Sequence, residues 1–374
     1  MESNNIITLS IVIPVYNGES YISDTIQSIL RSENTGIELL LIDDGSLDNT
    51  AQICRNWCIK DARVRYEYIE NSGIANARNR GIELANGQYI CFCDQDDEMV
   101  ISVYEQMIYT MTEKSATIGM CSTGRNINGD KTLYEIVEEG CYNKDDVLRK
   151  LLFPLLFRGY NYSFYEQKNY LYGTVWKCIF SLEFIKNNNI KFVSFVDYED
   201  DWIFVTHALS MSSVVTVTDK IGYYWSVNDS SRSHEKKYIS DIIPKIKAQD
   251  SYIYMYLCEN NAFSKEIYEE YKKIRLCEHY VDIIENAIYV DNKDVSKKNK
   301  QQIKEYLYST MYKKQLECQK MAQKTVFRRR FVCSALQYFG INAAMWIDFF
   351  IRWCEKNANK IQWLVKWERK GKLG

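Results

Sequence analysis

Proline, histidine and long apolar runs are all scarce in this sequence. Its 374 residues include only 3 Pro and 3 His, and no run of about 18 uninterrupted apolar residues occurs. We therefore predict no transmembrane span. The first residues also lack the basic stretch, apolar core and cleavage site of a secretory leader. We expect a protein of the cytoplasm, either soluble or peripheral on the inner face of the cell membrane.

Neither sign of charge dominates the chain. Lys and Arg together number 47, Asp and Glu number 49, and the formal net charge is −2. Because proteins that bind nucleic acid carry a basic surface, this balance favours no nucleic-acid partner. The sequence also contains no internal repeat and no low-complexity linker.

The 12 cysteines lack the spacing of zinc ligands. No Cys-x-x-Cys pair occurs among them. Cys54 and Cys58 have helical spacing, while Cys91 and Cys93 share one face of a predicted strand. We interpret the cysteines as reduced and mostly buried thiols.

The rest of the composition is that of an ordinary globular protein, with 46% hydrophobic and 26% charged residues. The length exceeds one average domain, and it favours two structural units or one domain with a large extension. The 29 Tyr suit sugar-binding surfaces, because a tyrosine ring has a flat apolar face and a polar tip.

Predicted strands and helices alternate over the first hundred residues. Short apolar runs predict four strands, at Leu9–Val15, Glu38–Ile42, about Val64–Ile69 and Gln88–Cys93. Helical spacing predicts helices between them, over about 21–30, after a cap at Asp48 or Thr50, and over about 74–85. This alternation predicts an α/β fold with a doubly wound, mostly parallel sheet.

Polar residues follow three of these strands where each strand ends. They are Asn17, Asp43, Asp44, Asp94 and Asp96. The carboxyl ends of parallel strands meet at one edge of a sheet, where ligands bind in a crevice. We therefore predict a ligand site at this edge.

Asp94 and Asp96 form an Asp-x-Asp pair that can offer oxygens to one divalent cation. Magnesium and manganese bind carboxylate and phosphate oxygens together, so they neutralise a diphosphate leaving group. The pair alone is a weak signal, and a solvated acidic turn is the alternative. Its place among other polar strand ends favours the metal site.

Four segments occur in a fixed order over about residues 8–100. They are Ile13–Asn17 (IPVYN), Ile42–Ser46 (IDDGS), Asn71–Gly81 (NSGIANARNRG) and Asp94–Asp97 (DQDD). In order and spacing they resemble the family 2 inverting glycosyltransferases of bacterial polysaccharide synthesis, which have the Rossmann-like GT-A fold. Each segment alone is unspecific, whereas the four together are highly specific.

The resemblance implies a nucleotide-sugar site. By position, Pro14, Tyr16 and Asn17 would flank the base and ribose. Asp43 would accept a hydrogen bond from the base, and Asp44 would shape the same turn. A carboxylate that accepts from a ring N–H suits uracil, so the expected donor is a UDP-sugar.

The resemblance also assigns the residues around the phosphates. Arg78 would face the diphosphate, for which a cation has an electrostatic role. Asp96 is the leading metal ligand, and Asp94 would support the ribose or the metal. Three further candidates for nucleotide-sugar binding are Glu19, Asn71 and Gln95, of which Glu19 could instead be a charge in a helix first turn.

Two downstream segments carry a weaker likeness. Val175–Phe180 resembles the family's segment before the acceptor site, where Lys177 would stabilise the segment or touch the ligand. Phe195–Phe204 (FVDYEDDWIF) resembles the Glu-Asp motif and its helix. By that match Asp200 is the general base, with Asp201 the second candidate and Glu199 the third. The alternative is a cluster of acids favoured by a helix dipole.

Three other features of the middle region enter the prediction. Leu148–Tyr172 is aromatic-rich and suits a lid or acceptor region. Tyr223–Trp225, with Asn228 and Ser230–Ser233, resembles a family loop that would close over the donor. His234 is a weaker candidate for phosphate or metal, and His207 is expected to pack on its helix.

The last part of the chain is predicted to be helical, from about Asp241 onward. Lys324–Gly374 contains eleven Lys and Arg against three Asp and Glu, interleaved with four Trp. The segment Lys360–Leu373 suits a helix that lies in an anionic membrane surface, or one that packs back on the protein.

We predict a GT-A domain over 1–235, with a nucleotide-binding half at about 1–100 and an acceptor half at about 101–235. A helical region with a basic, Trp-rich tail follows over 236–374. The expected reaction transfers one sugar from a UDP-sugar, with Mn or Mg, to a saccharide acceptor that can be lipid-linked. The Gln-x-x-Arg-Trp signature of processive synthases is absent, because Phe349 stands at the Gln position before Arg352-Trp353.

Two alternatives remain open. A sugar nucleotidyltransferase shares the sheet and the carboxylates, but it would need a Gly-rich, basic loop after the first strand, where this chain has Tyr16–Glu19. The other alternative is a catalytically inactive, glycosyltransferase-like binding module, which would be favoured if the metal carboxylates were missing.

Overall fold

The computed structural model describes residues 7–157, 171–195, 199–227, 239–260, 262–288, 301–302, 304–306, 331–332, 334–335 and 338–356. The chain divides into two compact units. The first holds the described residues of Met1–Arg158, Ser163–Ser233 and Ser251–Ala262. The second holds those of Gly159–Tyr162, His234–Asp250 and Phe263–Gly374.

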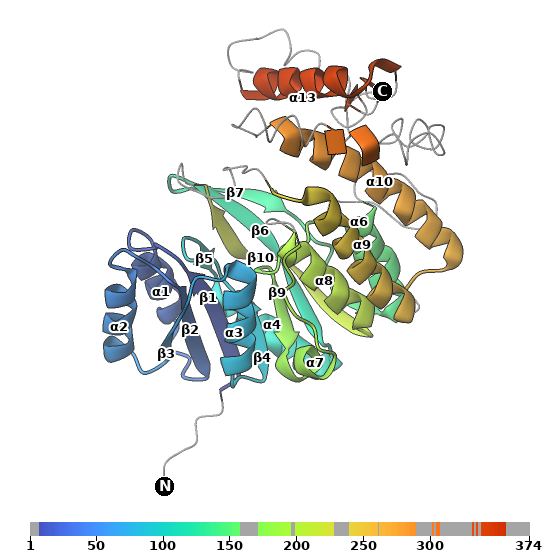
Figure 1. Cartoon of the computed structure of the whole chain (residues 1–374). Helices are drawn as coiled ribbons and strands as arrows, with labels where there is room; N and C mark the ends of the chain where they lie inside the picture. The colour runs from blue at the N-terminus through green and yellow to red at the C-terminus, as the bar shows by residue number, and fades with distance from the viewer. Residues whose placement is uncertain are drawn as a thin grey trace. The chain divides into compact units, whose positions relative to one another are not determined.

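The first unit is built on one ten-stranded sheet (Figure 1). Its strands are β1 (Leu9–Val15), β2 (Ile37–Asp44), β3 (Val64–Ile69), β4 (Tyr89–Phe92), β5 (Glu98–Met99), β6 (Ile118–Ile127), β7 (Asp130–Glu135), β8 (Gly140–Asn143), β9 (Cys178–Ser181) and β10 (Val214–Ser226). Along the main path of the sheet the order is β3-β2-β1-β4-β9-β6-β10-β5, while β7 pairs with β6 and β8 with β10.

Helices connect the strands of this unit. They are α1 (Ile22–Leu30), α2 (Thr50–Lys60), α3 (Ile74–Leu84), α4 (Ile101–Lys114), α5 (Lys144–Asp146), the π-helix η1 (Val147–Leu152), α6 (Phe153–Leu156), α7 (Leu182–Asn187) and α8 (Asp200–Met211). A further helix, α9 (Ile242–Glu259), has its residues 251–259 in this unit.

The parallel part of the sheet forms from the four apolar runs predicted to be strands. β1 and β2 are buried along their whole length, as expected of strands covered on both faces. β1 pairs in parallel with β2 and β4, and β2 pairs in parallel with β3. The predicted α/β fold with a doubly wound, mostly parallel sheet is thus confirmed.

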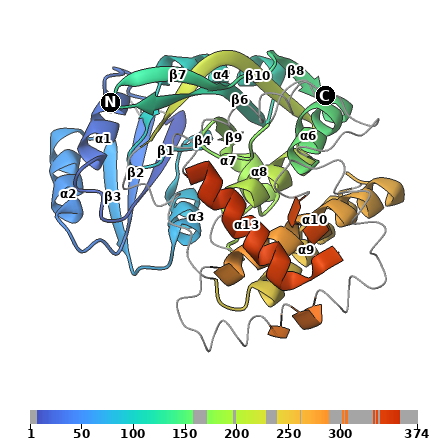
Figure 2. The ribbon, with the colours of Figure 1, turned by 90° about the horizontal axis from the view of Figure 1, so that it is seen from above.

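Helices cover both faces of the sheet, and side chains on β1 and β4 alternate between them. Ile11 and Cys91 belong to the core shared with α1 and α4, whereas Phe92 points the other way, toward Phe204 of α8. A Cβ on Gly81 would lie 2.2 Å from Val12 Cγ1, so glycine lets α3 pack directly on β1. As a result α3 and α8 lie on one face and α4 lies on the other (Figure 2).

Antiparallel strands complete the sheet beyond β4. β9 runs antiparallel to both of its neighbours, β4 and β6, and β6 then pairs in parallel with β10. Because two reversals restore the direction, β6 and β10 end at the same edge of the sheet as β1, β2 and β4. None of these later strands was predicted individually.

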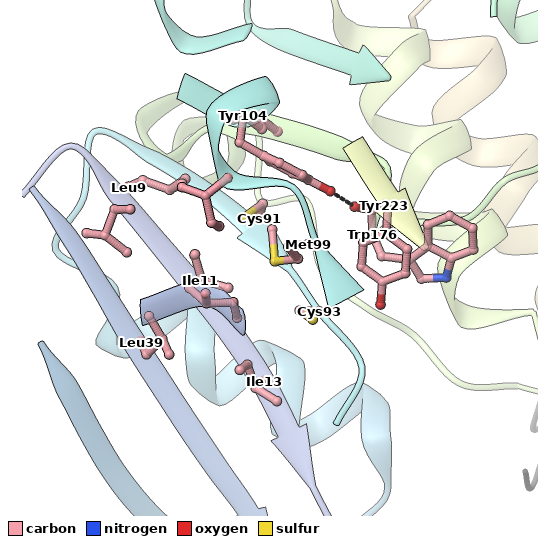
Figure 3. Packing of buried hydrophobic residues seen from close by; sticks show 14 of the residues in the cluster. Leu9, Ile11, Ile13, Leu39, Cys91, Cys93, Met99, Tyr104, Trp176 and Tyr223 are labelled. Atoms are coloured by element: carbon pink, nitrogen blue, oxygen red, sulfur yellow. Dashed lines mark hydrogen bonds between the residues drawn. The ribbon is translucent and has the colours of Figure 1, made fainter. Parts of the chain in front are cut away.

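A hydrophobic core joins the two halves of the sheet (Figure 3). The Trp176 ring stacks on Tyr223 of β10, with centroids 4.5 Å apart and planes 14° from parallel. Tyr104 of α4 donates from its hydroxyl to the Trp176 carbonyl oxygen over 2.6 Å. Cys91, Cys93 and the other thiols of this core are packing residues, as predicted for buried cysteines.

The second unit is helical in its described residues, which confirms the predicted helical C-terminal region. Its helices include α10 (Lys265–Ile288) and α13 (Ile341–Lys356), which pack on each other. Asn286 of α10 bonds both the backbone nitrogen and the carbonyl oxygen of Ile239, at 2.7 and 2.9 Å. No helix within the described ranges is long and apolar enough to cross a membrane. The predicted membrane segment Lys360–Leu373 lies outside those ranges.

Candidate active site

The loop after β1 is held by the acidic turn after β4. Gln95 accepts a hydrogen bond from the Tyr16 backbone nitrogen at 3.0 Å and donates to the Tyr16 carbonyl oxygen at 3.2 Å. Tyr16 is half-buried, and Pro14 is a buried residue of β1 opposite Ile42. Two candidates predicted for nucleotide binding, Tyr16 and Gln95, are therefore brought together from segments about eighty residues apart.

The loops after β1 and β2 are also tied together. Asn17, at φ 48°, accepts at its side-chain oxygen from the Leu47 nitrogen, and its own backbone nitrogen donates to Ser46. The Glu19 carboxylate accepts from both the backbone and side-chain nitrogens of Asn49, at 3.0 and 2.9 Å. Asn49 precedes α2, so Glu19 binds the start of that helix rather than the first turn of α1.

Asp43 and Asp44 end β2 with opposite orientations. Asp43 is fully buried, and it accepts from the Ser46 nitrogen and the Tyr66 hydroxyl. Asp44 accepts from the backbone nitrogens of Ser72 and Gly73 at 2.7 and 2.9 Å, just before α3. Asp44 thereby fixes the position of α3.

Asn71 is an exposed residue at the turn that Asp44 organises. Gly45, at φ 77°, faces it so closely that a Cβ there would lie 3.0 Å from the Asn71 nitrogen. Glycine is required at position 45 both by this approach and by the left-handed backbone.

Arg78 of α3 is the centre of the site. Its side chain is 3% exposed, and it binds three carboxylates. Nη2 donates to Asp94 Oδ1 at 3.0 Å, and Nη1 donates to Asp200 Oδ2 at 3.0 Å and to Asp201 Oδ1 at 2.5 Å. The guanidinium also lies over the Phe192 ring, 5.3 Å from its centroid. Arg78 thus joins the turn after β4 to the start of α8.

The three candidate bases lie at the N-terminus of α8 in different settings. Glu199 is half-buried and precedes the helix. Asp200 is buried and is held at Oδ2 by Arg78. Asp201 is held at both oxygens, by Arg78 and by the Val175 backbone nitrogen. Burial raises the pKa of Asp201 to about 7, with Arg78 opposing the rise and the charges of Asp200 and Asp94 adding to it.

The acidic turn contains one carboxylate that the sequence reasoning missed. Asp97 is buried, and it accepts from the Tyr223 hydroxyl at 2.6 Å and from the Ser226 nitrogen at 2.8 Å. The Tyr223 hydroxyl in turn accepts from the Asp94 backbone nitrogen at 3.0 Å. Burial raises the pKa of Asp97 well above its usual range. As the third acid in the run Asp94–Asp97, it showed no sign of this structural role in the sequence.

Asp94 and Asp96 are the residues predicted to hold a divalent cation, and Asp94 Oδ1 accepts from Arg78 Nη2. Both are half-buried on the turn after β4. Within the part of the chain that the structure describes, no group of three or more His, Cys, Asp or Glu is placed to hold a metal. Two carboxylates with phosphate oxygens completing the shell are the usual arrangement for magnesium in a nucleotide site.

Lys177 does not reach this turn. It is fully buried and forms an ion pair with Glu135 at the end of β7, 2.6 Å away. The same Glu135 oxygen accepts from the Tyr172 backbone nitrogen at 2.9 Å. Of the two roles predicted for Lys177, stabilising its segment is the one that agrees with this geometry. Glu135 was missed because nothing in its local sequence distinguishes it from a surface acid.

Several other predicted residues lie away from the cluster or outside the described ranges. Tyr223–Trp225 belong to β10, and the Tyr223 ring is buried. His207 stacks on Tyr256 with centroids 4.3 Å apart, and burial lowers its pKa to about 4. Outside the described residues lie Asn228, Ser230–Ser233, His234 and residues 158–170 of the aromatic-rich segment.

Comparison with known families and sequences identifies relatives of the N-terminal half. The family model described as Glycosyl transferase family 2 matches residues 10–182. Glycosyltransferase GlyG of Streptococcus pneumoniae is 38% identical over 111 residues, which are 29% of this chain and 37% of GlyG. TuaG of Bacillus subtilis, a glycosyltransferase named for teichuronic acid biosynthesis, is 37% identical over 108 residues, 29% of this chain and 43% of TuaG. The chain spans less than half the length of these two relatives.

A solved structure resembles the chain over more of its length. It is S. aureus TarS 1-349 in complex with UDP-GlcNAc, which superimposes with a TM-score of 0.56 and covers 92% of this chain and 91% of that one. The sequence identity is 16%, so the likeness is one of fold. It agrees with the GT-A arrangement predicted from the sequence.

Proposed function

We propose that this chain, which matches glycosyl transferase family 2 over residues 10–182, transfers a single sugar from a UDP-sugar to a hydroxyl of a saccharide acceptor, with inversion. The observation that carries this proposal is the placement of Arg78. Its guanidinium holds the start of α8, at Asp200, within one ion cluster with Asp94 of the Asp-x-Asp turn. The proposed donor residue Asp94 and the proposed acceptor residue Asp200 would then lie next to each other.

Asp200 is the proposed general base. Its carboxylate would take the proton of the acceptor hydroxyl as that oxygen attacks the anomeric carbon. The bond from the carbon to the diphosphate oxygen breaks on the opposite side, so an α-linked donor gives a β-linked product. Asp201 and Glu199 remain the second and third candidates. Asp201 has both oxygens engaged in the described structure, whereas Asp200 is held at one, which favours Asp200.

The proposed donor site lies along the carboxyl ends of β1, β2 and β4. Pro14, Tyr16 and Asn17 would flank the base and ribose, with Gln95 holding the Tyr16 backbone. Asp43 would bind the base, since a carboxylate retains lone pairs after accepting from Ser46 and Tyr66.

The remaining donor contacts are proposed on the same grounds. Glu19, Asp44 and Asn71 would shape the surrounding loops, and Arg78 would add positive charge beside the diphosphate. Asp96, with Asp94, would hold magnesium or manganese, which neutralises the leaving diphosphate when bound. The UDP-GlcNAc in the TarS complex supports a uridine donor through likeness of fold.

The acceptor is proposed to belong to a cell-surface polysaccharide, a role supported by the name of TuaG. We also propose that the C-terminal region contacts an anionic membrane surface that carries a lipid-linked acceptor. On α13, Trp346, Phe349, Phe350 and Trp353 are each at least 44% exposed, as on helices that lie in a membrane interface. Cosedimentation of the full chain with anionic and with neutral vesicles tests this contact. We expect binding to the anionic vesicles, and an absence of binding to them would contradict the proposal.

The division of labour along the chain is likewise a proposal. Residues 1–235 would form the catalytic domain, with donor binding over about 1–100 and acceptor binding over about 101–235. Residues 236–374 would bind the membrane surface that carries the acceptor. The ion cluster and its supporting strands lie within residues 7–227, which supports this division, although residues 251–262 also belong to the first unit.

The test is incubation of the full chain with a panel of UDP-sugars and Mn²⁺ or Mg²⁺, with UDP release as the readout. We expect release with at least one donor and its loss in Asp200→Asn. Nucleotide binding without turnover of any donor would favour the inactive binding module. Pyrophosphate release from UTP and a sugar 1-phosphate would instead identify the nucleotidyltransferase, which the family match disfavours.

A further inference from the structure

The guanidinium of Arg125 on β6 lies over two aromatic rings and is not used by the proposed donor site. Arg125 Cζ is 4.0 Å from the centroid of the Tyr134 ring of β7 and 5.5 Å from that of Trp225 of β10. Tyr134 also meets the Tyr172 ring, with centroids 5.0 Å apart and planes at 31°. All four side chains are half-buried. We call Arg125, Tyr134, Tyr172 and Trp225 the stacked cluster.

The Arg125 guanidinium lacks an acceptor for its donors within the described residues. Nε is buried and makes no hydrogen bond there, and no carboxylate forms an ion pair with the group. Among the described arginines of the unit, those that are as strongly enclosed, such as Arg78, meet carboxylates. A half-buried cation without a counter-charge is unfavourable, and stacking on aromatic rings offsets only part of that cost.

The two rings also restrict how the guanidinium can turn. Those of Tyr134 and Trp225 both lie against it, and β6 is paired with both of their strands, so that Arg125 is opposite Trp225 in the parallel ladder. A guanidinium held by its face presents its N–H groups at the edge, where they match a carboxylate or phosphate in a two-point contact.

Two chain segments connect the stacked cluster to the proposed reaction centre. In one of them, Trp225 is flanked by Tyr223 and Ser226, which both bond Asp97 of the acidic turn. In the other, Tyr172 belongs to the segment whose Val175 nitrogen holds Asp201. A saccharide approaching Asp200 from this part of the sheet edge would therefore pass the stacked cluster.

We propose that Arg125 binds an anionic group of the acceptor, so that the preferred acceptors are saccharides that carry a carboxylate or a phosphate. Calling the bound saccharide an acceptor rests on the proposed glycosyl transfer. The binding of the anion by Arg125 does not require turnover. Arg125 makes the contact directly, and Tyr134 and Trp225 position it.

The test measures binding to the full chain saturated with UDP. Glucose, glucuronate and glucose 6-phosphate are the probes, and titration calorimetry is the readout. We expect at least one of the two anions to bind at least about tenfold more tightly than glucose, because a carboxylate or a phosphate makes charged hydrogen bonds that glucose lacks. The glucuronate and phosphate arms distinguish the two sources of the anion.

Two variants and one control complete the test. Arg125→Gln should remove the preference for the anions, and Arg125→Lys should reduce it, because lysine keeps the charge but not the two-point fork. Lys60→Gln removes a cation that stacks on Trp57, 4.8 Å from its ring, away from the site, and should leave the preference unchanged. Urea unfolding reports whether each variant remains folded.

Three results would overturn the proposal. They are equal binding of the three probes to the wild-type chain, unchanged preference in Arg125→Gln, and a loss of UDP affinity in the folded Arg125→Lys variant with anion binding intact. The last would place Arg125 on the donor. Failure of UDP release from any donor would contradict the proposed transferase while leaving this binding result standing.

Discussion

Arg78 Nη1 lies 3.0 Å from Asp200 Oδ2, although 122 positions separate the two residues in the chain. Arg78 comes from α3, in the half proposed to bind the nucleotide, and Asp200 begins α8. The pair therefore couples the position of the proposed base to α3, which Asp44 anchors at its start. Loss of either partner should affect more than one part of the site.

The first prediction concerns Arg78 itself. Arg78→Met would leave three carboxylates close together in a buried place, so we expect the free energy of unfolding to fall by about 3–5 kcal/mol. Arg78→Lys should be less destabilising but should still lower kcat/KM, since one ammonium cannot reproduce the forked contacts to Asp94, Asp200 and Asp201. Urea unfolding and UDP release measure the two effects.

Arg80 offers a matched control on the same helix. Its ion pairs to Glu67 and Glu83 are at the surface, where such pairs contribute little. Arg80→Lys should therefore leave unfolding and turnover unchanged. If Arg78→Lys behaves like Arg80→Lys, the cluster has no part in positioning the base.

The second prediction separates the two candidate bases. Asp200→Asn should lower the transfer rate by about 10²–10⁴, because proton transfer by a positioned side chain contributes a factor of that size. UDP affinity should persist. Asp201→Asn should keep a measurable rate, and Asp24→Asn, in the exposed first turn of α1, should have no effect. A nearly normal rate in Asp200→Asn together with loss in Asp201→Asn would transfer the role of base to Asp201.

The third prediction follows from the raised pKa of Asp201. Its folded-state pKa of about 7 exceeds the ordinary value of 3.8, so between these pH values the folded chain keeps a proton that the unfolded chain has lost. The unfolded state then binds fewer protons, and stability falls as pH rises through this window, by at most about 1.4 kcal/mol per pH unit. Arg78, Asp200 and Asp94 are the charges that face the group.

Asp201→Asn isolates this contribution from that of Asp97, whose raised pKa acts in the same direction. Urea unfolding of both proteins at pH 5, 6, 7 and 8 provides the comparison. We expect the wild type to lose stability relative to Asp201→Asn with each step up to about pH 7. A difference that stays constant over this range would mean that Asp201 ionises normally.

The local parts of the fold could be predicted because they depend on local patterns. The apolar runs at Leu9–Val15 and Val64–Ile69 have the predicted bounds, and polar residues end β1, β2 and β4 at a common edge. The second strand was predicted to stop at Ile42, but pairing with β1 and β3 extends it through Asp43 and Asp44. The end of a strand depends on its hydrogen bonds to neighbouring strands, and the sequence of one segment does not reveal those bonds.

The long-range contacts of the site could not be predicted in the same way. The ion pairs of Arg78 with Asp200 and Asp201 could not be predicted from spacing, because the lengths of the loops between α3 and α8 do not determine which residues meet. Arg125 and Glu135 were missed for the same reason, since their roles arise from pairing between β6, β7 and β10 and from a segment after α6. The resemblance identified candidate site residues, whereas the residues that contact them are known only from the structure.

The last prediction concerns the buried ion pair between Lys177 and Glu135. Lys177→Met would leave the Glu135 carboxylate, 1% exposed, without its cation, so we expect a loss of about 3–5 kcal/mol in unfolding free energy. The Lys177→Met, Glu135→Leu double variant replaces the pair by apolar groups and should recover much of that stability. Lys131→Met, which breaks a partly exposed pair with Glu98, is the control and should cost less than about 1 kcal/mol. Because Glu135 also binds the Tyr172 nitrogen, the double variant should remain slower in sugar transfer even when it is stable. Full activity in the stable double variant would show that the pair supports folding alone and does not position the segment that reaches Asp201.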